Sequence, residues 1–177
     1  EGEMSFAELL QKVSDTGIER VRFVTSHPWD FTDEMIEVIA KNKNVMPYVH
    51  LPLQSGSSNI LKLMGRRYTK EEYLTLHNKI KETVPGVAIT TDIIVGFPNE
   101  TESDFQDTLD VVNECKYDSA FTFIFSPRIG TPAAKMEDKV TLKEKEERLH
   151  RLNELVNKYS LEANKQYLNK DVEVLIE

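Results

Sequence analysis

The sequence contains very little cysteine and no long apolar run. Cys115 is the only cysteine among 177 residues. One thiol cannot form a disulfide within the chain, so the sequence is typical of a protein from a reducing compartment such as the cytosol. No apolar segment has the length of a membrane span, and no signal peptide is recognised at the start of the sequence. We therefore expect a cytoplasmic protein without a membrane partner.

The sequence also lacks an excess of basic residues. It has 30 acidic residues against 22 Lys and Arg, a formal net charge of −8. This balance argues against broad non-specific binding to nucleic acid, although a local basic patch remains possible. The apolar fraction of 40% is ordinary for a folded domain, and the length is sufficient for one core. The charged run KEKEER (143–148) predicts a solvated helix face.

Helices are indicated by capping residues and by apolar residues at helical spacing. Ser5 and Glu8 have the spacing of a capping box, and so do Thr69 and Glu72. Gly17 stands where a left-handed residue would end the first helix. Within the penultimate helix, Cys115 is expected to be a packed core thiol. The expected helices are 5–15, 32–42, 59–65, 69–84, 101–115 and a long charged helix over 142–168.

Four apolar segments alternate with these helices and are typical of strands. Their starts fall roughly 30–40 residues apart, which permits parallel pairing and disfavours hairpins. The sequence therefore predicts an α/β fold with a parallel sheet of about four βα units, either open or a curved section of a barrel, ending in a long helix. Four strands are too few to close a barrel. The expected strands are 20–27, 48–54, 87–98 and 119–127.

The ends of these strands carry glycine, proline and small polar residues. In parallel α/β folds, ligands bind where the carboxyl ends of the strands meet. Gly96 would allow the backbone to approach a flat ligand, and free backbone groups there could recognise an adenine edge. No nucleophile, metal-ligand spacing or acid–base pair is recognised, so no catalytic residue and no metal site are predicted within this sequence.

Three long motifs, in this order, resemble the radical S-adenosylmethionine methylthiotransferases. They are HLPLQSGSSNILKLMGRRYTKEEY (50–73), TTDIIVGFPNETESDF (90–105) and FTFIFSPRIGTPAAKM (121–136). The segment SHPWDFTD (26–33) and the last motif are most similar to the MiaB type. The resemblance covers roughly residues 5–168. It implies an enzyme that adds a methylthio group to C2 of N6-isopentenyladenosine in the anticodon loop of tRNA, with S-adenosylmethionine and [4Fe–4S] clusters as cofactors.

Other functions remain open at this point. Sister enzymes that modify threonylcarbamoyladenosine in tRNA, or a ribosomal protein, share similar motifs, although the wording SPRIGTPAA disfavours the ribosomal-protein type. A noncatalytic RNA-binding or interaction module is a second alternative, disfavoured by the acidic balance. A metal-dependent hydrolase using Asp92 and Glu100 is a third, and no recognised metal-binding spacing supports it.

Members of this family bind one cluster through a CxxxCxxC motif after the first barrel strand and a second cluster in an N-terminal domain. This sequence has neither motif, and Cys115 alone cannot hold a [4Fe–4S] cluster. The resemblance therefore implies that residues 1–170 are the later four strands of a six-stranded, TIM-like (βα)6 barrel. Residues 171–177 resemble the start of a truncated TRAM domain. By itself, the chain is expected to be catalytically inactive.

The resemblance assigns cofactor contacts to several strand ends. Gln54 would contact the methionine or ribose end of S-adenosylmethionine, and Ser55 would form its turn. Arg66, or its neighbour Arg67, would bind the methionine carboxylate, for which a guanidinium is a suitable partner. Asp92 would lie near the ribose hydroxyls; a carboxylate within an apolar strand needs some partner. Without the resemblance, Gln54 and Ser55 would be interpreted as turn residues. Arg66 and Arg67 would be interpreted as the exposed end of a helix.

Two further strand ends would hold the adenine. Val95, Gly96 and Phe97 match the motif that lies along the base, and Phe125 and Ser126 would close the pocket from the other side. The residues that would face the substrate are Ser26, His27 and Arg128, although a histidine before a proline is more often a loop residue held by hydrogen bonds.

The sequence also predicts an exposed sheet edge. Without the first two barrel strands, the segment that starts at residue 20 would present unpaired backbone groups. We expect the 5–15 helix to shield part of this edge, and self-association of two chains through the remainder is a further prediction.

Overall fold

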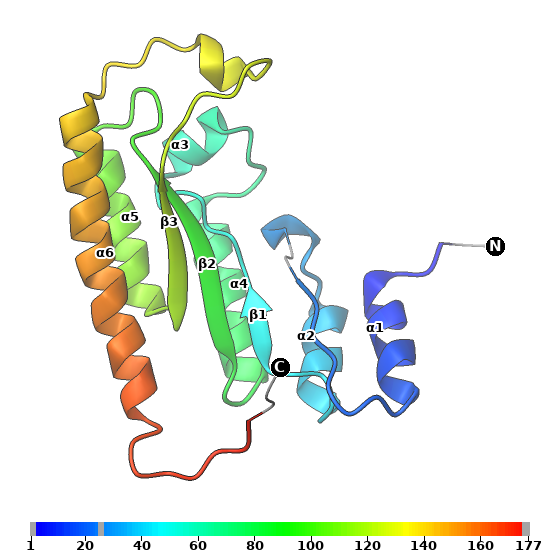
Figure 1. Cartoon of the computed structure of the whole chain (residues 1–177). Coiled ribbons are helices and arrows are strands. Elements are labelled where there is room, and N and C mark those ends of the chain that lie inside the picture. Colours follow the sequence, from blue (N-terminus) through cyan, green and yellow to red (C-terminus); the bar gives the residue numbers. More distant parts are fainter. Residues whose placement is uncertain (1–2, 25–26, 175–177) are drawn as a thin grey trace.

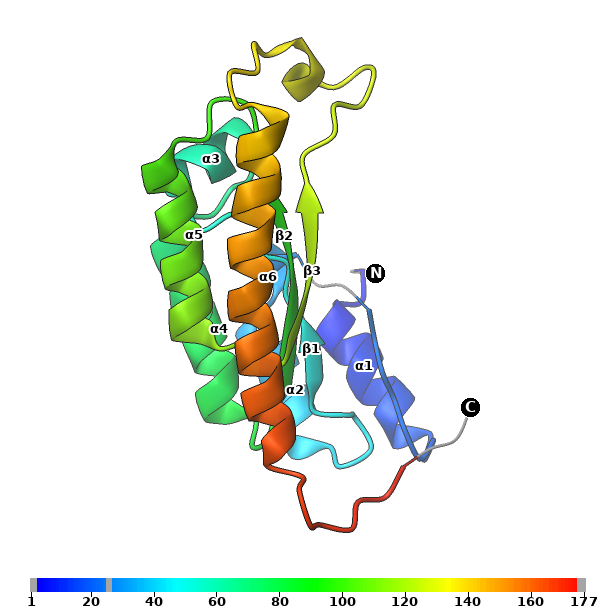
Figure 2. The same ribbon diagram turned by 60° about the vertical axis from the view of Figure 1, so that its left-hand side comes forward.

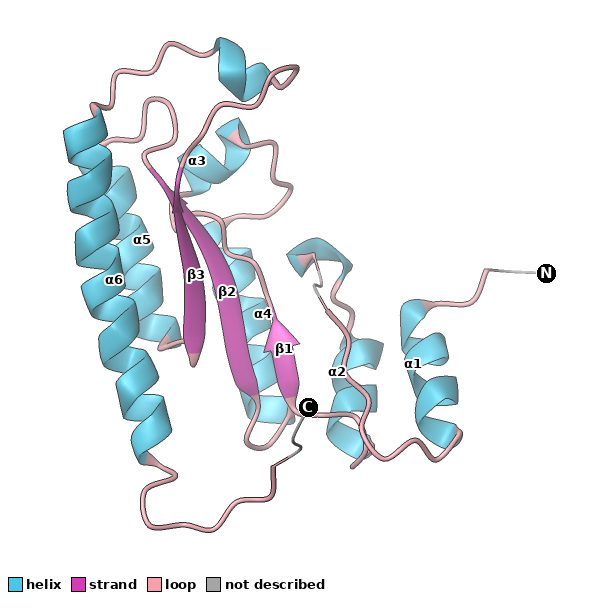
Figure 3. Cartoon of the chain, viewed as in Figure 1, coloured by secondary structure: helices cyan, strands magenta, loops and turns pink. Residues whose placement is uncertain are grey.

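The computed structural model describes residues 3–24 and 27–174 as an α/β fold with one parallel sheet (Figure 1). Strand β1 (Tyr48–His50) pairs with β2 (Ala88–Val95), which pairs with β3 (Ser119–Ile124), in the order β1-β2-β3. Both pairings are parallel, with Val49 opposite Ile89 and Thr91 opposite Ala120. The parallel α/β architecture predicted from the sequence is confirmed, and Figure 3 shows the three strands side by side.

Helices follow the expected order, and their starts lie within one residue of the predicted ones. Their first residues are preceded by side-chain caps, including complete capping boxes at Ser5 and Thr69. Gly17 has the expected left-handed backbone (φ 81°). The helices are α1 (Phe6–Asp15), α2 (Asp33–Lys41), α3 (Ser58–Leu63), α4 (Lys70–Thr83), α5 (Glu102–Cys115) and α6 (Leu142–Lys165), with short 3₁₀ turns at Pro28–Asp30 and Pro132–Lys135.

The helices cover one face of the sheet and leave the other face open. Helix α6 packs on β3 and α5, α5 packs on α4, and α4 packs on α2, which in turn contacts α1. Figure 2 shows α4, α5 and α6 together on one side of the strands. On the opposite side, Phe121 and Phe123 of β3 are 58% and 51% exposed. The sheet is thus a section of a barrel wall, with its inner face accessible.

The core lies between the sheet and the helices. Val49, Ile89 and Ile93 point toward the helices and are fully buried. The Tyr73 hydroxyl donates to the Leu51 carbonyl (2.8 Å) and accepts from the Tyr117 hydroxyl (3.0 Å). Burial raises the pKa of both tyrosines well above the ordinary value. In the part of the chain that the structure describes, no helix is long and apolar enough to cross a membrane.

The first expected strand, residues 20–27, is the main correction. Among the described residues of this segment, only Val21 pairs, in a single parallel bridge with Val45; residues 25 and 26 lie outside the described residues. The Val21 amide donates to the Asn44 carbonyl (2.7 Å). Residues 22–24 do not extend this pairing into a ladder of strand hydrogen bonds, and Val24 is 84% exposed. A strand needs a partner that exchanges backbone hydrogen bonds with it along several residues, and the described part of this segment has such a partner only at Val21. Among the residues that the structure describes, the sheet therefore has three strands in place of four, and the first expected strand is reduced to the Val21–Val45 bridge.

Helix α1 contacts this edge segment, as expected. The rings of Phe6 and Phe23 lie edge to face with centroids 5.5 Å apart. The Ser14 hydroxyl donates to Asn44 Oδ1 (2.6 Å), and Asn44 returns a bond to the Ser14 carbonyl (3.0 Å). The rest of the edge is not covered by these contacts, so self-association through it stays a prediction.

The stability of a Gly56 variant tests how closely the backbone at this position packs against α5. A Cβ at this position would lie 2.4 Å from the Thr108 Cα and 2.5 Å from the Asp107 carbonyl oxygen. We expect Gly56→Ala to lower the free energy of unfolding by about 2 kcal/mol, because backbone atoms of a packed helix must move. Gly86→Ala is the matched control: it has a left-handed φ of 70° but no atom nearby, so it should cost about 1 kcal/mol. Equal losses in urea denaturation would contradict this account.

His77 of α4 predicts a dependence of stability on pH. Its side chain is buried, 5.8 Å from the Tyr117 ring, and burial lowers the pKa of the imidazole. The unfolded chain takes up a proton near pH 6.5, whereas the folded chain takes it up only at a lower pH, so stability falls as the pH decreases through this range. Between pH 7.5 and 5.5 we expect a loss of roughly 1 kcal/mol that His77→Phe removes. Urea midpoints at both pH values measure this; the same loss in the variant would contradict it.

Candidate cofactor site

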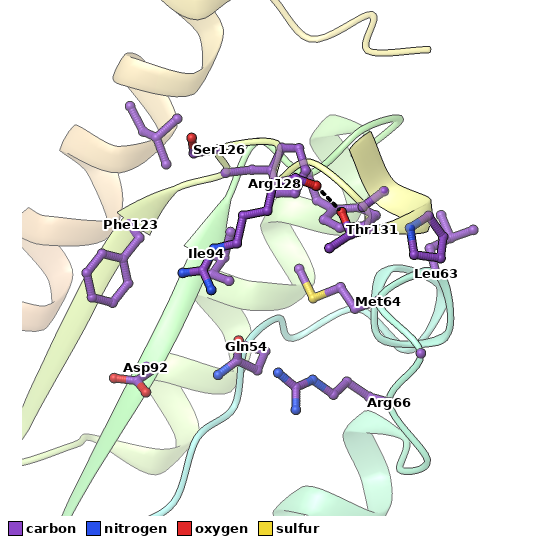
Figure 4. A pocket seen from close by; sticks show the side chains of 16 residues that line it. Gln54, Leu63, Met64, Arg66, Asp92, Ile94, Phe123, Ser126, Arg128 and Thr131 are labelled. Atoms are coloured by element: carbon purple, nitrogen blue, oxygen red, sulfur yellow. Dashed lines mark hydrogen bonds between the residues drawn. The ribbon is translucent and has the colours of Figure 1, made fainter. Parts of the chain in front are cut away.

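A cavity of about 710 Å³ lies at the carboxyl ends of β2 and β3. Its walls come from four parts of the chain: the tip beyond β1, the end of α3, the end of β2 with the loop after it, and the end of β3 with the segment that follows (Figure 4). This is the edge at which parallel α/β folds bind ligands. The lining residues are Gln54, Leu63, Met64, Gly65, Arg66, Asp92, Ile94, Phe97, Phe123, Ile124, Phe125, Ser126, Arg128, Thr131, Pro132 and Ala133.

Gln54 holds the floor of the cavity in a left-handed conformation. Its φ is 66°, which costs a residue with a Cβ about 1–2 kcal/mol. Two backbone hydrogen bonds hold it there: its amide donates to the Asp92 carbonyl (2.8 Å), and its carbonyl accepts from the Ile94 amide (2.9 Å). In Figure 4 the Gln54 side chain lies between those of Asp92 and Arg66.

The turn after Gln54 is packed into α5. Ser55 is fully buried, and its hydroxyl accepts from the Ser57 amide (3.2 Å). The Gly56 amide donates to the Thr108 hydroxyl (2.9 Å), and the Ser57 hydroxyl donates to Asp104 (2.6 Å). Ser55 therefore supports the turn and does not line the cavity.

The structure distinguishes between the two arginines that the sequence left open. Arg66 lines the cavity, and its Nη1 lies 2.8 Å from His27 Nε2. Burial and the Arg66 charge lower the pKa of His27, so the neutral imidazole accepts this bond. Arg67 lies instead over the ring of Trp29, 5.4 Å from its centre. His27 contacts the cavity wall through Arg66 and does not line the cavity.

Gly96 and its neighbours form a turn that α6 holds from behind. The Gly96 amide donates to Glu100 Oε2 (2.8 Å), which also accepts from Arg148 (2.9 Å). Burial raises the pKa of Glu100, and both partners oppose that shift. A Cβ on Gly96 would lie 2.4 Å from the Lys145 side chain. The close approach that requires glycine is thus made by a helix of the same chain.

The adenine side of the expected site is aromatic. Phe97 and Phe125 lie edge to face with centroids 4.9 Å apart, and both line the cavity. Val95 is fully buried and faces the core. Val95 and Gly96 therefore stand behind the wall, whereas Phe97, Phe125 and Ser126 form it.

Most residues selected from the sequence meet at this one cavity. Those that line it are Gln54, Arg66, Asp92, Phe97, Phe125, Ser126 and Arg128. The sequence reasoning missed the end of α3, Ile94, Phe123 and the segment 131–133. Ile94 and Phe123 had a usable signal, since they stand two residues from Asp92 and Phe125 and so share a strand face. Met64 and Thr131 had no such signal in the sequence, because the packing of loops places them at the cavity.

Comparisons with known proteins identify the family. The sequence profile of the Radical SAM superfamily matches residues 2–112. The chain belongs to the radical SAM superfamily. It is 56% identical over 170 residues to the tRNA-2-methylthio-N(6)-dimethylallyladenosine synthase of Staphylococcus epidermidis, and 54% identical over 175 residues to that of Bacillus cytotoxicus. These alignments cover 96% and 99% of this chain, but 33% and 34% of the relatives.

This radical SAM chain thus spans about a third of the length of the curated relatives it matches. Among solved structures, coproporphyrinogen III oxidase (HemN) from Escherichia coli, described as a radical SAM enzyme, matches with a TM-score of 0.62 at 18% identity. The match covers 75% of this chain and 31% of the oxidase. At that identity the likeness shows the shared fold, which agrees with the partial barrel seen here.

The residues present fit one of the family's cofactors and not the other. A cavity with an aromatic wall, a carboxylate and an arginine suits an adenosyl amino acid such as S-adenosylmethionine. A [4Fe–4S] cluster needs several thiolates. The single cysteine, Cys115, is 4% exposed in the core, and burial raises its pKa to about 12. This chain alone does not supply a cluster site.

The contacts of Glu100 disfavour the metal-hydrolase alternative. Glu100 is 3% exposed, pairs with Arg148 and does not line the cavity with Asp92. Among the residues that the structure describes, no group of three histidine, cysteine or acidic side chains is placed to hold a metal ion.

The environment of Cys115 predicts very low thiol reactivity. With its pKa at about 12, the thiolate is a minute fraction at pH 8, and the sulfur is shielded by the core. We expect the folded chain to react with a disulfide reagent such as Ellman's at least about 100-fold more slowly than the chain in guanidinium chloride. Release of the coloured thiolate measures both rates, and comparable rates would contradict the packing described here.

Proposed function

We propose that this chain forms part of a tRNA methylthiotransferase that adds a methylthio group to C2 of N6-isopentenyladenosine. The observation that carries the proposal is the identity of 53–57% to synthases for this nucleoside across nearly the whole chain. The cavity at the strand ends supports it, because the matching residues meet where a cofactor would bind. The whole activity requires cluster ligands that these 177 residues do not include.

Within this proposal, the cavity holds S-adenosylmethionine. Phe97, Phe125 and Ser126 would contact the adenine, Asp92 and Gln54 the ribose, and Arg66 the methionine carboxylate. When bound next to a reduced cluster, this cofactor supplies the radical that activates the substrate carbon. The chain's own contribution is to bind and orient the cofactor and to exclude water from it.

The tRNA would approach from the open side of the sheet. Arg128 lines the cavity beyond β3, and its charge suits a phosphate or a base edge. Phe121 and Phe123 offer exposed rings on the same sheet face, as expected where an unstacked base is bound. His27 would act through Arg66, and Ser26 lies outside the described residues. A cytoplasmic location follows from this substrate. Residues 171–174 are described without a strand, so the start of a TRAM domain stays a prediction.

A segment exchange tests the proposal in an intact enzyme. Residues 5–168 would replace the matching segment of the Staphylococcus epidermidis synthase, expressed in a bacterial strain that lacks tRNA methylthiolation. We expect 2-methylthio-N6-isopentenyladenosine in the digested tRNA, measured by liquid chromatography and mass spectrometry. Accumulation of unmodified N6-isopentenyladenosine, or methylthiolation of threonylcarbamoyladenosine instead, would contradict the proposal.

Two amide substitutions in the exchanged segment provide a matched comparison. Asp92→Asn removes the cavity carboxylate, and we expect the modified nucleoside to fall by about 10-fold or more, since a hydrogen bond to a charged group is lost. Glu146→Gln changes an exposed side chain of α6 and should leave the yield unchanged. Equal yields of the modified nucleoside from both variants would contradict a role for Asp92 in binding the cofactor.

A further inference from the structure

A chain of polar side chains crosses the open face of the sheet beneath the cavity. The Tyr48 hydroxyl lies 3.0 Å from the Thr90 hydroxyl, which lies 2.9 Å from His50 Nδ1. His50 Nε2 lies 3.2 Å from Asp92 Oδ2. The register places His50 opposite Thr90, and Asp92 two residues farther along β2. All four side chains therefore share the face away from the helices.

The direction of these hydrogen bonds follows from the acceptor at one end. An ionised Asp92 only accepts, so His50 Nε2 must carry the proton. In the neutral imidazole, Nδ1 then accepts from the Thr90 hydroxyl, which in turn accepts from the Tyr48 hydroxyl. Both ring nitrogens of His50 are thus committed, and its orientation is set from two sides. Its side chain is 11% exposed and does not line the cavity.

The two oxygens of Asp92 have different surroundings. Oδ2 accepts from His50, whereas Oδ1 receives no hydrogen bond from the described residues. The Asp92 side chain is 30% exposed and lines the cavity. A carboxylate in this position retains one free acceptor for a ligand hydroxyl.

We propose that His50 is a positioning residue that holds Asp92 so that Oδ1 accepts a hydrogen bond from a ribose hydroxyl of the adenosyl ligand. The inference rests on the proposed function, because it assumes an adenosyl ligand in the cavity. The inference gives a role to His50, which the sequence motifs left without one and which does not line the cavity. Thr90 and Tyr48 continue the same support from behind.

The test measures binding of S-adenosylhomocysteine to the 177-residue chain by calorimetry. His50→Phe keeps a planar ring but has no donor, and we expect the dissociation constant to rise by about 10-fold. His50→Gln retains an N–H that can reach Asp92, so its dissociation constant should equal that of the original chain. Thr90→Val removes the donor to Nδ1 with little change of shape, and a rise of about 3-fold is expected.

A ligand without the hydroxyls separates positioning from general damage. For the 2′,3′-dideoxy analogue of S-adenosylhomocysteine, the three variants and the original chain should bind equally, since Asp92 has nothing to accept. An unchanged dissociation constant in His50→Phe, or the same loss with the dideoxy analogue, would overturn the inference. If His50→Phe does not fold, as judged by circular dichroism, the Gln and Val variants decide the outcome with the same pair of ligands.

The result is distinguishable from failure of the proposed function. If the original chain does not bind S-adenosylhomocysteine at all, the cofactor site and this inference both fail. If the exchanged synthase is inactive but the His50 variants show the expected pattern, the proposed reaction fails and the positioning of Asp92 stands. If the synthase is active and His50→Phe binds normally, only the inference is wrong.

Discussion

The pairing of Gln54 with β2 is the constraint on which the site depends. β1 ends at His50, yet the chain returns to β2 at Gln54, where two backbone hydrogen bonds connect it to Asp92 and Ile94. These bonds hold a glutamine at a positive φ that it would otherwise avoid. They also bring its side chain beside Asp92, so that two strand ends share one cavity floor. The turn that follows then packs closely against the backbone of α5 at Gly56, where a side chain larger than that of glycine has no room.

Helix α6 supplies the second constraint from outside the sheet. The sequence predicts that KEKEER is a solvated helix face, and for Lys145 and Arg148 this is wrong: they are 7% and 5% exposed. Arg148 neutralises Glu100, which holds the Gly96 amide, and the Lys145 stem packs on Gly96 itself. A buried ion pair of this kind is costly to break, because removal of one partner leaves a charge without compensation. The long helix therefore fixes the turn that carries Phe97.

The fold could be predicted from the sequence wherever local and tertiary signals agreed. Capping boxes placed the helix starts, and apolar runs placed β2 and β3, because these strands are covered by helices. The segment at Val21 has the same apolar character but lacks a neighbouring strand, which no local pattern can report. Within the site, residues selected at strand ends, such as Gln54 and Ser126, line the cavity because strand ends converge, whereas Ile94 and Phe123 on the strands themselves were missed. Met64 and Thr131 were missed because their positions are set by loop packing.

Asp92 shows why a site can be recognisable before its ligand is seen. A carboxylate on a strand flanked by apolar residues is unfavourable unless its oxygens are used. The structure uses one oxygen, through a histidine that is itself held by Thr90, and leaves the other at the cavity. Because the Asp92 side chain is 30% exposed, water can satisfy that second oxygen when no ligand is bound. The oxygen at the cavity is therefore available to a ligand that donates a hydrogen bond, and the ribose of an adenosyl group has suitable hydroxyls.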